Sequence, residues 1–142
     1  MTLERWRRLL PGLWAGWLLC VALLATPAPF ALLALADAGR VAGRMLAQEA
    51  YTSLALGVVL LAIERIAARR GGRGSQFSVD FGLVLGTLFC TVAGYFALQP
   101  MMAAARAGTG SLSFGQLHAI SAAFYVVKAL LVLVLAWRAA AR

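Results

Sequence analysis

Four long apolar stretches dominate the chain, and each is long enough to cross a lipid bilayer. A membrane-spanning helix needs about 20 mainly apolar residues, and such runs occur at about 9–36, 45–66, 79–102 and 114–137. Only short polar segments separate these runs. The pattern predicts an all-α membrane protein, a four-transmembrane-helix bundle that forms a single domain over residues 1–142.

The composition excludes a soluble domain. Hydrophobic residues make up 63% of the chain and charged residues only 13%, whereas soluble domains are typically about half apolar and a quarter charged. A chain of 142 residues is too short to bury that much apolar surface in a core of its own. We therefore expect the lipid bilayer to be the solvent of this chain.

The arginines predict the orientation in the membrane. The net charge of +8 does not indicate nucleic-acid binding, because the arginines occupy the short segments between apolar runs. Nine lie on one predicted side and three on the other, and the positive-inside rule places the side with nine in the cytoplasm. Both termini are thus predicted to be cytoplasmic, in a bacterial inner membrane. The nine are Arg5, Arg7, Arg8, Arg65, Arg69, Arg70, Arg73, Arg138 and Arg142; the three are Arg40, Arg44 and Arg106.

The N-terminal segment also has features of a signal peptide. Arginines precede an apolar run, and Ala34-Leu35-Ala36 resembles a cleavage site. The apolar run is about twice the length of the apolar region of a signal peptide. We therefore expect a helix that stays in the bilayer.

One apolar phrase occurs twice, seventy residues apart. GLWAGWLLC begins at Gly12 and GLVLGTLFC begins at Gly82. Small residues spaced by four share one helix face, and such faces let membrane helices approach closely. The spacing predicts a contact between the first and third helices at Gly16 and Gly86. The predicted helix-packing residues are Gly12, Gly16, Cys20, Gly82, Gly86, Cys90 and Gly94.

The second and fourth apolar runs contain a fainter repeat. QEAYTSLALGVV begins at Gln48 and QLHAISAAFYVV begins at Gln116. Together the two pairs favour a duplicated helical hairpin, with the copies arranged as parallel repeats. The alternative is chance similarity in a chain rich in Leu, Ala, Gly and Val.

Motifs that carry catalytic or metal chemistry are missing from the sequence. There is no nucleophile-elbow motif, no phosphate-binding glycine loop and no paired-carboxylate spacing. The two cysteines, Cys20 and Cys90, lack the spacing of metal ligands. We therefore predict no catalytic, cofactor-binding or metal-binding residues, no cofactor and no enzymatic activity.

Polar residues inside the apolar runs are the candidate functional residues, because such groups are costly in a bilayer. In the fourth run, polar residues that follow one another at steps of 3, 4 and 3 lie along one helix face: His118, Ser121, Tyr125 and Lys128. Glu49 and His118 are both predicted about one turn inside the outer boundary, so we expect them to be neighbours. The alternative is that these polar groups only form hydrogen bonds between helices and have no other role. The candidate polar seam is Glu49, His118, Ser121, Tyr125 and Lys128.

Lys128 is the residue of this seam that most needs a partner. It lies about 15 Å from Arg138 along a helix, too deep for its ammonium to reach the surface with ease. Pro27 and Pro29 are predicted to kink the first helix and to leave backbone carbonyls free there. We expect Lys128 inside the bundle, bonded to those carbonyls or to a bound anionic ligand; the alternative is a tolerated surface lysine.

Several short motifs share their order and spacing with a known family. They are Trp14-Ala15-Gly16, Ala28-Pro29-Phe30, Ala38-Gly39-Arg40 with Gly43, Gln99-Pro100, and Phe114-x-x-Leu117-His118-x-x-Ser121. In this order they resemble the transmembrane-protein-205-like family, whose bacterial branch is the domain of unknown function 4149. The resemblance covers residues 9–135 and implies a four-helix membrane protein without an assigned mechanism. Tyr125 stands where the family commonly has Asn, and a midspan lysine is unusual, so the resemblance implies no role for Lys128.

Three classes of function fit these features. A structural or accessory membrane protein, acting as a homo-oligomer or with a membrane-protein partner, agrees best with the small size and low charge. An oligomeric transporter of small molecules that uses the polar seam is the first alternative. A haem- or copper-associated membrane protein is the second, although one histidine cannot supply two haem ligands within a single chain.

Overall fold

The first membrane-spanning segment is interrupted where its sequence reaches the prolines. In the computed structural model, which describes residues 2–71 and 78–141, α1 (Thr2–Cys20) leads into a π-helical segment, η1 (Val21–Ala25), and then into α2 (Pro27–Leu32). The N–H of Thr26 donates to the Val21 carbonyl at 2.9 Å. The acceptor lies five residues earlier in the chain, which is the hydrogen-bond spacing of a π-helix. Pro27 begins α2, where a missing N–H costs least. The irregularity predicted at the prolines is present and begins about one turn earlier.

The second segment, α3 (Leu35–Arg70), is longer than the sequence predicts. Residues 37–44 were expected to form a loop, and this expectation is wrong, because they are helical. Asp37 accepts a hydrogen bond from Arg40 one turn later, and Ala38 and Ala42 are buried. A charged pair at the helix end and two packed alanines offset the low helix propensity of the glycines in this stretch.

The third and fourth segments form a second hairpin. The third consists of α4 (Val79–Thr91), the π-helical η2 (Val92–Ala97) and α5 (Leu98–Arg106). The fourth is the single helix α6 (Phe114–Ala140), which begins with a capping box between Ser113 and Gln116. Arg73, Arg142 and the segment around Ser75 lie outside the described residues.

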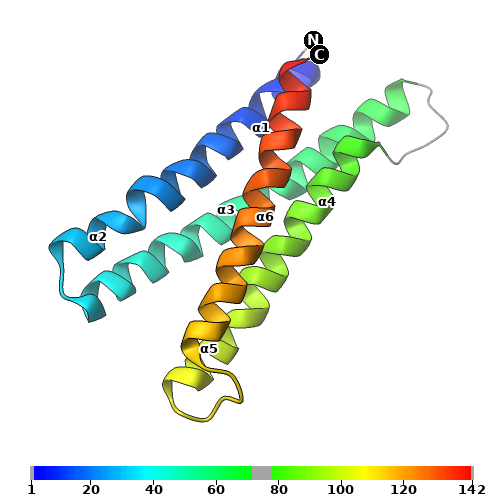
Figure 1. Ribbon diagram of the computed structural model, residues 1–142. Helices are drawn as coiled ribbons and strands as arrows, with labels where there is room; N and C mark the ends of the chain where they lie inside the picture. The colour runs from blue at the N-terminus through cyan, green and yellow to red at the C-terminus, as the bar shows by residue number, and fades with distance from the viewer. Residues whose placement is uncertain (1, 72–77, 142) are drawn as a thin grey trace.

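The described residues contain four helical segments that are long and apolar enough to cross a membrane. They are Leu3–Leu32, Leu35–Arg70, Val79–Arg106 and Phe114–Ala140. The predicted all-helical membrane fold is therefore confirmed. Both chain ends lie at one end of the molecule, here called the terminal end, whereas α2 and α5 lie at the opposite, distal end (Figure 1).

The helices pack in an order that the sequence repeat did not predict. α6 packs against both α1 and α4, and α3 also packs against both, so α1 and α4 are not the principal partners of each other. The two hairpins diverge toward the distal end, where α2 and α5 lie apart (Figure 1). The main buried apolar cluster consists of Trp14, Ala15, Leu18, Leu60, Val84, Val132 and Leu135.

The two hairpins contact each other through equivalent positions of the sequence repeats. Leu18 and Leu88 occupy the same place in the two nine-residue phrases, and Gly57 and Tyr125 occupy the same place in the two longer ones. The Tyr125 hydroxyl donates to the Leu18 carbonyl at 2.8 Å. A Cβ added to Gly57 would lie 2.5 Å from the Leu88 side chain. The duplication of the hairpin remains a prediction.

Candidate functional site

A buried ion pair joins the two hairpins near the middle of the helices. The Nζ of Lys128 on α6 lies 2.7 and 2.8 Å from the two carboxylate oxygens of Glu49 on α3. The two residues are 3% and 2% exposed. Burying either charge alone costs several kcal/mol, so each side chain depends on the other. This pair is the centre of the candidate site.

Glu49 is also bonded along its own helix, and this bond connects the pair to α1. The Ser53 hydroxyl, four residues after Glu49 and therefore on the same helix face, donates to Glu49 Oε1 at 2.5 Å. The indole N–H of Trp14 donates to the Ser53 oxygen at 2.9 Å. Trp14 and Ser53 are fully buried. A continuous chain of polar contacts thus runs from Trp14 through Ser53 and Glu49 to Lys128.

Tyr125 and Ser121 bind α6 to the two irregular helices. The Tyr125 ring lies 4.6 Å from the Lys128 ammonium, a cation–π contact, while its hydroxyl binds the Leu18 carbonyl just before η1. The Ser121 hydroxyl donates to the carbonyl of Gly94 within η2 at 2.6 Å. Hydroxyl groups one turn apart on α6 therefore bind the backbone at or beside both π-helical segments.

His118 lies apart from this site. It is exposed and stacks on Phe114 at 5.9 Å between ring centroids, while the Arg106 guanidinium lies 4.5 Å above the same Phe114 ring. His118 is ten residues, or about 15 Å, from Lys128 along α6, so a carboxylate bonded to Lys128 cannot also reach it. The expectation that Glu49 and His118 are neighbours is therefore wrong. The reason is that α3 begins at Leu35, which places Glu49 four turns inside its helix.

The expectation for Lys128 is correct in its position and wrong in its partner. Lys128 is buried inside the helix assembly, as predicted. Its ammonium binds Glu49 and not the carbonyls predicted to be freed by Pro27 and Pro29. The Tyr125 hydroxyl binds a different carbonyl of the first segment, that of Leu18. Trp14 and Ser53 are not part of the predicted polar seam, although the four-residue step from Glu49 to Ser53 indicates that these two side chains share a helix face.

The small-residue positions divide into open and packed groups. A Cβ added to Gly12, Gly16 or Gly82 would meet nothing within 4 Å. On the third segment, a Cβ on Gly86 would lie 3.1 Å from Leu131 of α6, and one on Gly94 would collide with Phe124. The predicted close contact between Gly16 and Gly86 is therefore wrong. Cys20 is exposed and Cys90 is buried.

Two further ion pairs lie toward the terminal end of the helices. Arg7 of α1 binds both carboxylate oxygens of Glu64 on α3, at 2.6 and 2.7 Å. Arg138 of α6 binds Asp80 of α4 at 2.7 Å. Each pair joins the two helices of one hairpin. Neither pairing was predicted from the sequence.

Comparison with known proteins identifies the family. The family model described as a domain of unknown function (DUF4149) matches residues 9–111, which is most of the chain. The chain belongs to the DUF4149 family. Searches of the curated proteins and of the solved structures find no match.

The DUF4149 match ends before α6 begins. It includes α3 with Glu49 and Ser53, and most of α1 with Trp14, but it stops short of Phe114. The match therefore covers one side of the buried ion pair, and Lys128 lies outside it. The motif from Phe114 to Ser121, on which the predicted resemblance partly rested, also lies outside it.

The site of this DUF4149 protein consists of polar contacts within the protein. Among residues 2–71 and 78–141, no group of three or more His, Cys, Asp or Glu side chains is placed to hold a metal ion. Lys128, Glu49, Ser53, Trp14 and Tyr125 all use each other or a backbone carbonyl as partners. Chemically, the arrangement can hold one positive and one negative charge away from water and fix the register of three helices.

Proposed function

We propose that this DUF4149 protein is a structural or accessory membrane protein that associates through α1 with a second copy of itself. The observation that carries the proposal is the open face of Gly12, Gly16 and Cys20 on α1. Faces of small residues spaced by four are a common contact between membrane helices, including parallel helix dimers. On α1 this face has no partner helix within the described chain.

The second hairpin supports the same proposal. Gly86 and Gly94 belong to the equivalent series of small residues on the third segment, and there the series packs against Leu131 and Phe124 of α6. The chain thus uses one such series for helix contact and leaves the other open. In a dimer with two-fold symmetry, the same surface of each copy forms the contact. The small-residue face of α1 can form such a contact with its own copy.

Cys20 provides a direct test, because it lies on the open face while Cys90 is buried. Mild oxidation in membranes should cross-link the wild type into a disulfide-linked dimer. Cys20→Ser should abolish the product, Cys90→Ser should retain it, and Gly16→Leu should reduce it severalfold by holding the helices apart. Gel electrophoresis without reductant measures the dimer. Val126→Cys in the Cys20→Ser background, at an exposed position of α6, controls for random collisions. If the wild type forms no more cross-linked dimer than this control variant does, the proposal is contradicted.

We also propose that the protein resides in a bacterial inner membrane with both termini in the cytoplasm. The uneven distribution of arginines supports this orientation, and the two chain ends lie at the same end of the molecule (Figure 1). Reporter fusions after Ser75 and after Gly108 should give opposite signals, cytoplasmic for Ser75 and external for Gly108. Equal signals from the two fusions would exclude the orientation.

Transport of a small molecule is the second candidate function. The observation that favours it is that Glu49 and Lys128 come from different hairpins and meet near midspan. In transporters built from repeats, the substrate and coupling-ion sites lie at the repeat interface near the bilayer midplane, between discontinuous helices. Reconstituted vesicles should then show a proton or solute flux that Glu49→Gln removes.

A further inference from the structure

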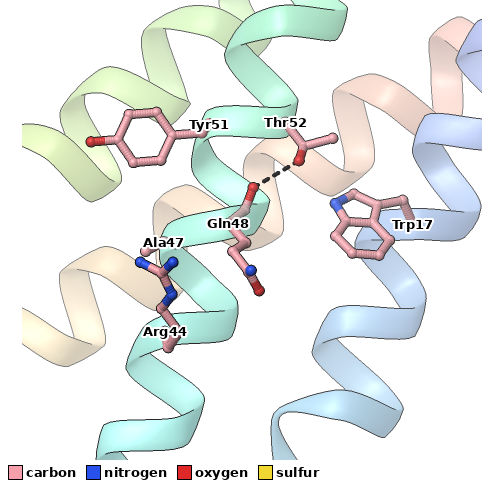
Figure 2. A pocket seen from close by; sticks show the side chains of 6 residues that line it. All are labelled: Trp17, Arg44, Ala47, Gln48, Tyr51 and Thr52. Carbon is pink, nitrogen blue, oxygen red and sulfur yellow. Dashed lines mark hydrogen bonds between the residues drawn. The ribbon is translucent and has the colours of Figure 1, made fainter.

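A groove with a charged edge lies across one face of α3, with Trp17 of α1 on one side of the helix and Arg44 and Tyr51 on the other (Figure 2). It has a volume of about 580 Å³ and is lined by Trp17 of α1 and by Arg44, Ala47, Gln48, Tyr51 and Thr52 of α3. Figure 2 shows these side chains along α3, with the Trp17 ring between α1 and α3. The Thr52 hydroxyl donates to the Gln48 carbonyl at 2.8 Å, and the Tyr51 ring packs edge-on against Phe96 of η2. The groove therefore has one cation, two aromatic side chains and one amide.

Arg44 has no ion-pair partner among the acidic side chains of residues 2–71 and 78–141. The chain contains five acidic residues, all within these ranges, and each of them is paired with at least one other basic side chain. Glu4 pairs with Arg7 and Arg8, Asp37 with Arg40, Glu49 with Lys128, Glu64 with Arg7, and Asp80 with Arg138. The two carboxylates nearest to Arg44 along α3, Asp37 and Glu49, are both engaged in this way. An anion that pairs with Arg44 would therefore come from outside the described chain.

The position of the groove along the helices indicates which anion this is. Arg44 lies twenty residues, or about 30 Å, from Glu64, whose pair with Arg7 lies toward the terminal end. The apolar layer of a bilayer is also about 30 Å thick, so with the Arg7–Glu64 pair at one boundary of this layer, Arg44 is expected at the level of the phosphate groups on the other side. Trp17 lies ten residues, or about 15 Å, from Arg7. The groove thus extends from the headgroup level to the middle of the apolar layer.

We propose that this groove binds one anionic phospholipid, with its phosphate on Arg44 and an acyl chain along Trp17. A guanidinium forms strong, charge-assisted hydrogen bonds to phosphate. The exposed amide of Gln48, one turn deeper than Arg44, donates to the ester oxygens below the phosphate. Tyr51 and Trp17 provide the apolar walls, as aromatic residues commonly do near the membrane interface. The residues that bind the headgroup lie on α3, whereas the open face of Gly12, Gly16 and Cys20 lies on α1, so phosphate binding by Arg44 does not depend on the proposed dimer.

The test is lipid binding by the purified protein in detergent, measured by native mass spectrometry and by the shift in Tm on adding lipid. Phosphatidylglycerol should bind and raise Tm, whereas phosphatidylcholine and inorganic phosphate should have little effect. Arg44→Gln should weaken phosphatidylglycerol binding about fivefold, the effect of one basic residue near anionic lipid. The matched control is Arg40→Gln, one turn away on α3 and paired with Asp37, which should bind as the wild type does.

Four outcomes would overturn the proposal. Equal binding of phosphatidylglycerol by wild type and Arg44→Gln would remove Arg44 from the site. A Tm shift with inorganic phosphate as large as that with lipid would show an anion site without a role for the acyl chain. A change of oligomeric mass in Arg44→Gln would assign the groove to a protein contact. A Trp17→Ala variant that binds the lipid as tightly as the wild type would show that Trp17 does not contact the acyl chain. The charge-state distribution in the mass spectrum shows whether that variant is folded.

Discussion

Lys128→Met should destabilise the protein by about 3–5 kcal/mol, the usual cost of removing one partner from a buried ion pair. Glu49 would then remain as an isolated carboxylate, 2% exposed and bonded only to Ser53. Lys128→Met combined with Glu49→Gln should recover most of this loss, because the neutral amide still accepts from Ser53. The free energy of unfolding, measured by titration with sodium dodecyl sulfate in mixed micelles, should show this recovery.

The matched control for the buried pair is Arg40→Gln. Arg40 also binds a carboxylate, that of Asp37, but the two side chains are 82% and 51% exposed, so the loss of this pair should cost no more than about 1 kcal/mol. If Lys128→Met costs as little as Arg40→Gln, the central pair is not desolvated as its burial implies. A double variant that is stable but lacks a flux seen with the wild type would favour transport over a purely structural role.

The second large effect is expected at Gly94, where α4–η2 and α6 approach closely. Gly94→Ala should cost at least about 1–3 kcal/mol, the range for overpacking a tight contact, because the added methyl would collide with Phe124. The same change should weaken the hydrogen bond from Ser121 to the Gly94 carbonyl. The same unfolding titration measures the loss.

Gly82→Ala is the control for this prediction, since it adds the same atom to the same transmembrane segment. A Cβ at Gly82 meets nothing within 4 Å, so this variant should not lose stability and should gain up to about 1 kcal/mol from the higher helix propensity of alanine. Equal losses of stability in the two variants would mean that the contact with Phe124 does not determine the cost at Gly94.

The number of helices could be predicted from the sequence because a bilayer imposes a length on each apolar run. The depth of individual residues could not, because it depends on where each helix begins. Residues 37–44 contain Asp37, Arg40 and two glycines and resemble a loop, but they extend α3. The resulting error in the depth of Glu49 hid its pairing with Lys128 and suggested His118 instead.

It was easier to predict which face of a helix forms a close contact than to predict which other helix lies against that face. The spacing of Gly86 and Gly94 correctly indicated a face for close packing, but the spacing does not state which helix approaches. α6 occupies that position, and the equivalent face on α1 stays open. The contact of Trp14 with Ser53 could not be predicted, because it depends on the rotation of α1 relative to α3.

The two backbone contacts of α6 have a mechanical consequence. Ser121 binds a carbonyl of η2 and Tyr125 binds the carbonyl of Leu18, three residues before η1. The two side chains lie one turn apart on a single rigid helix, so a rotation of α6 about its own axis strains both bonds at once. A change in the tilt of α1 relative to α6 therefore acts on the same helix that binds η2, and the two discontinuous segments are mechanically coupled through α6.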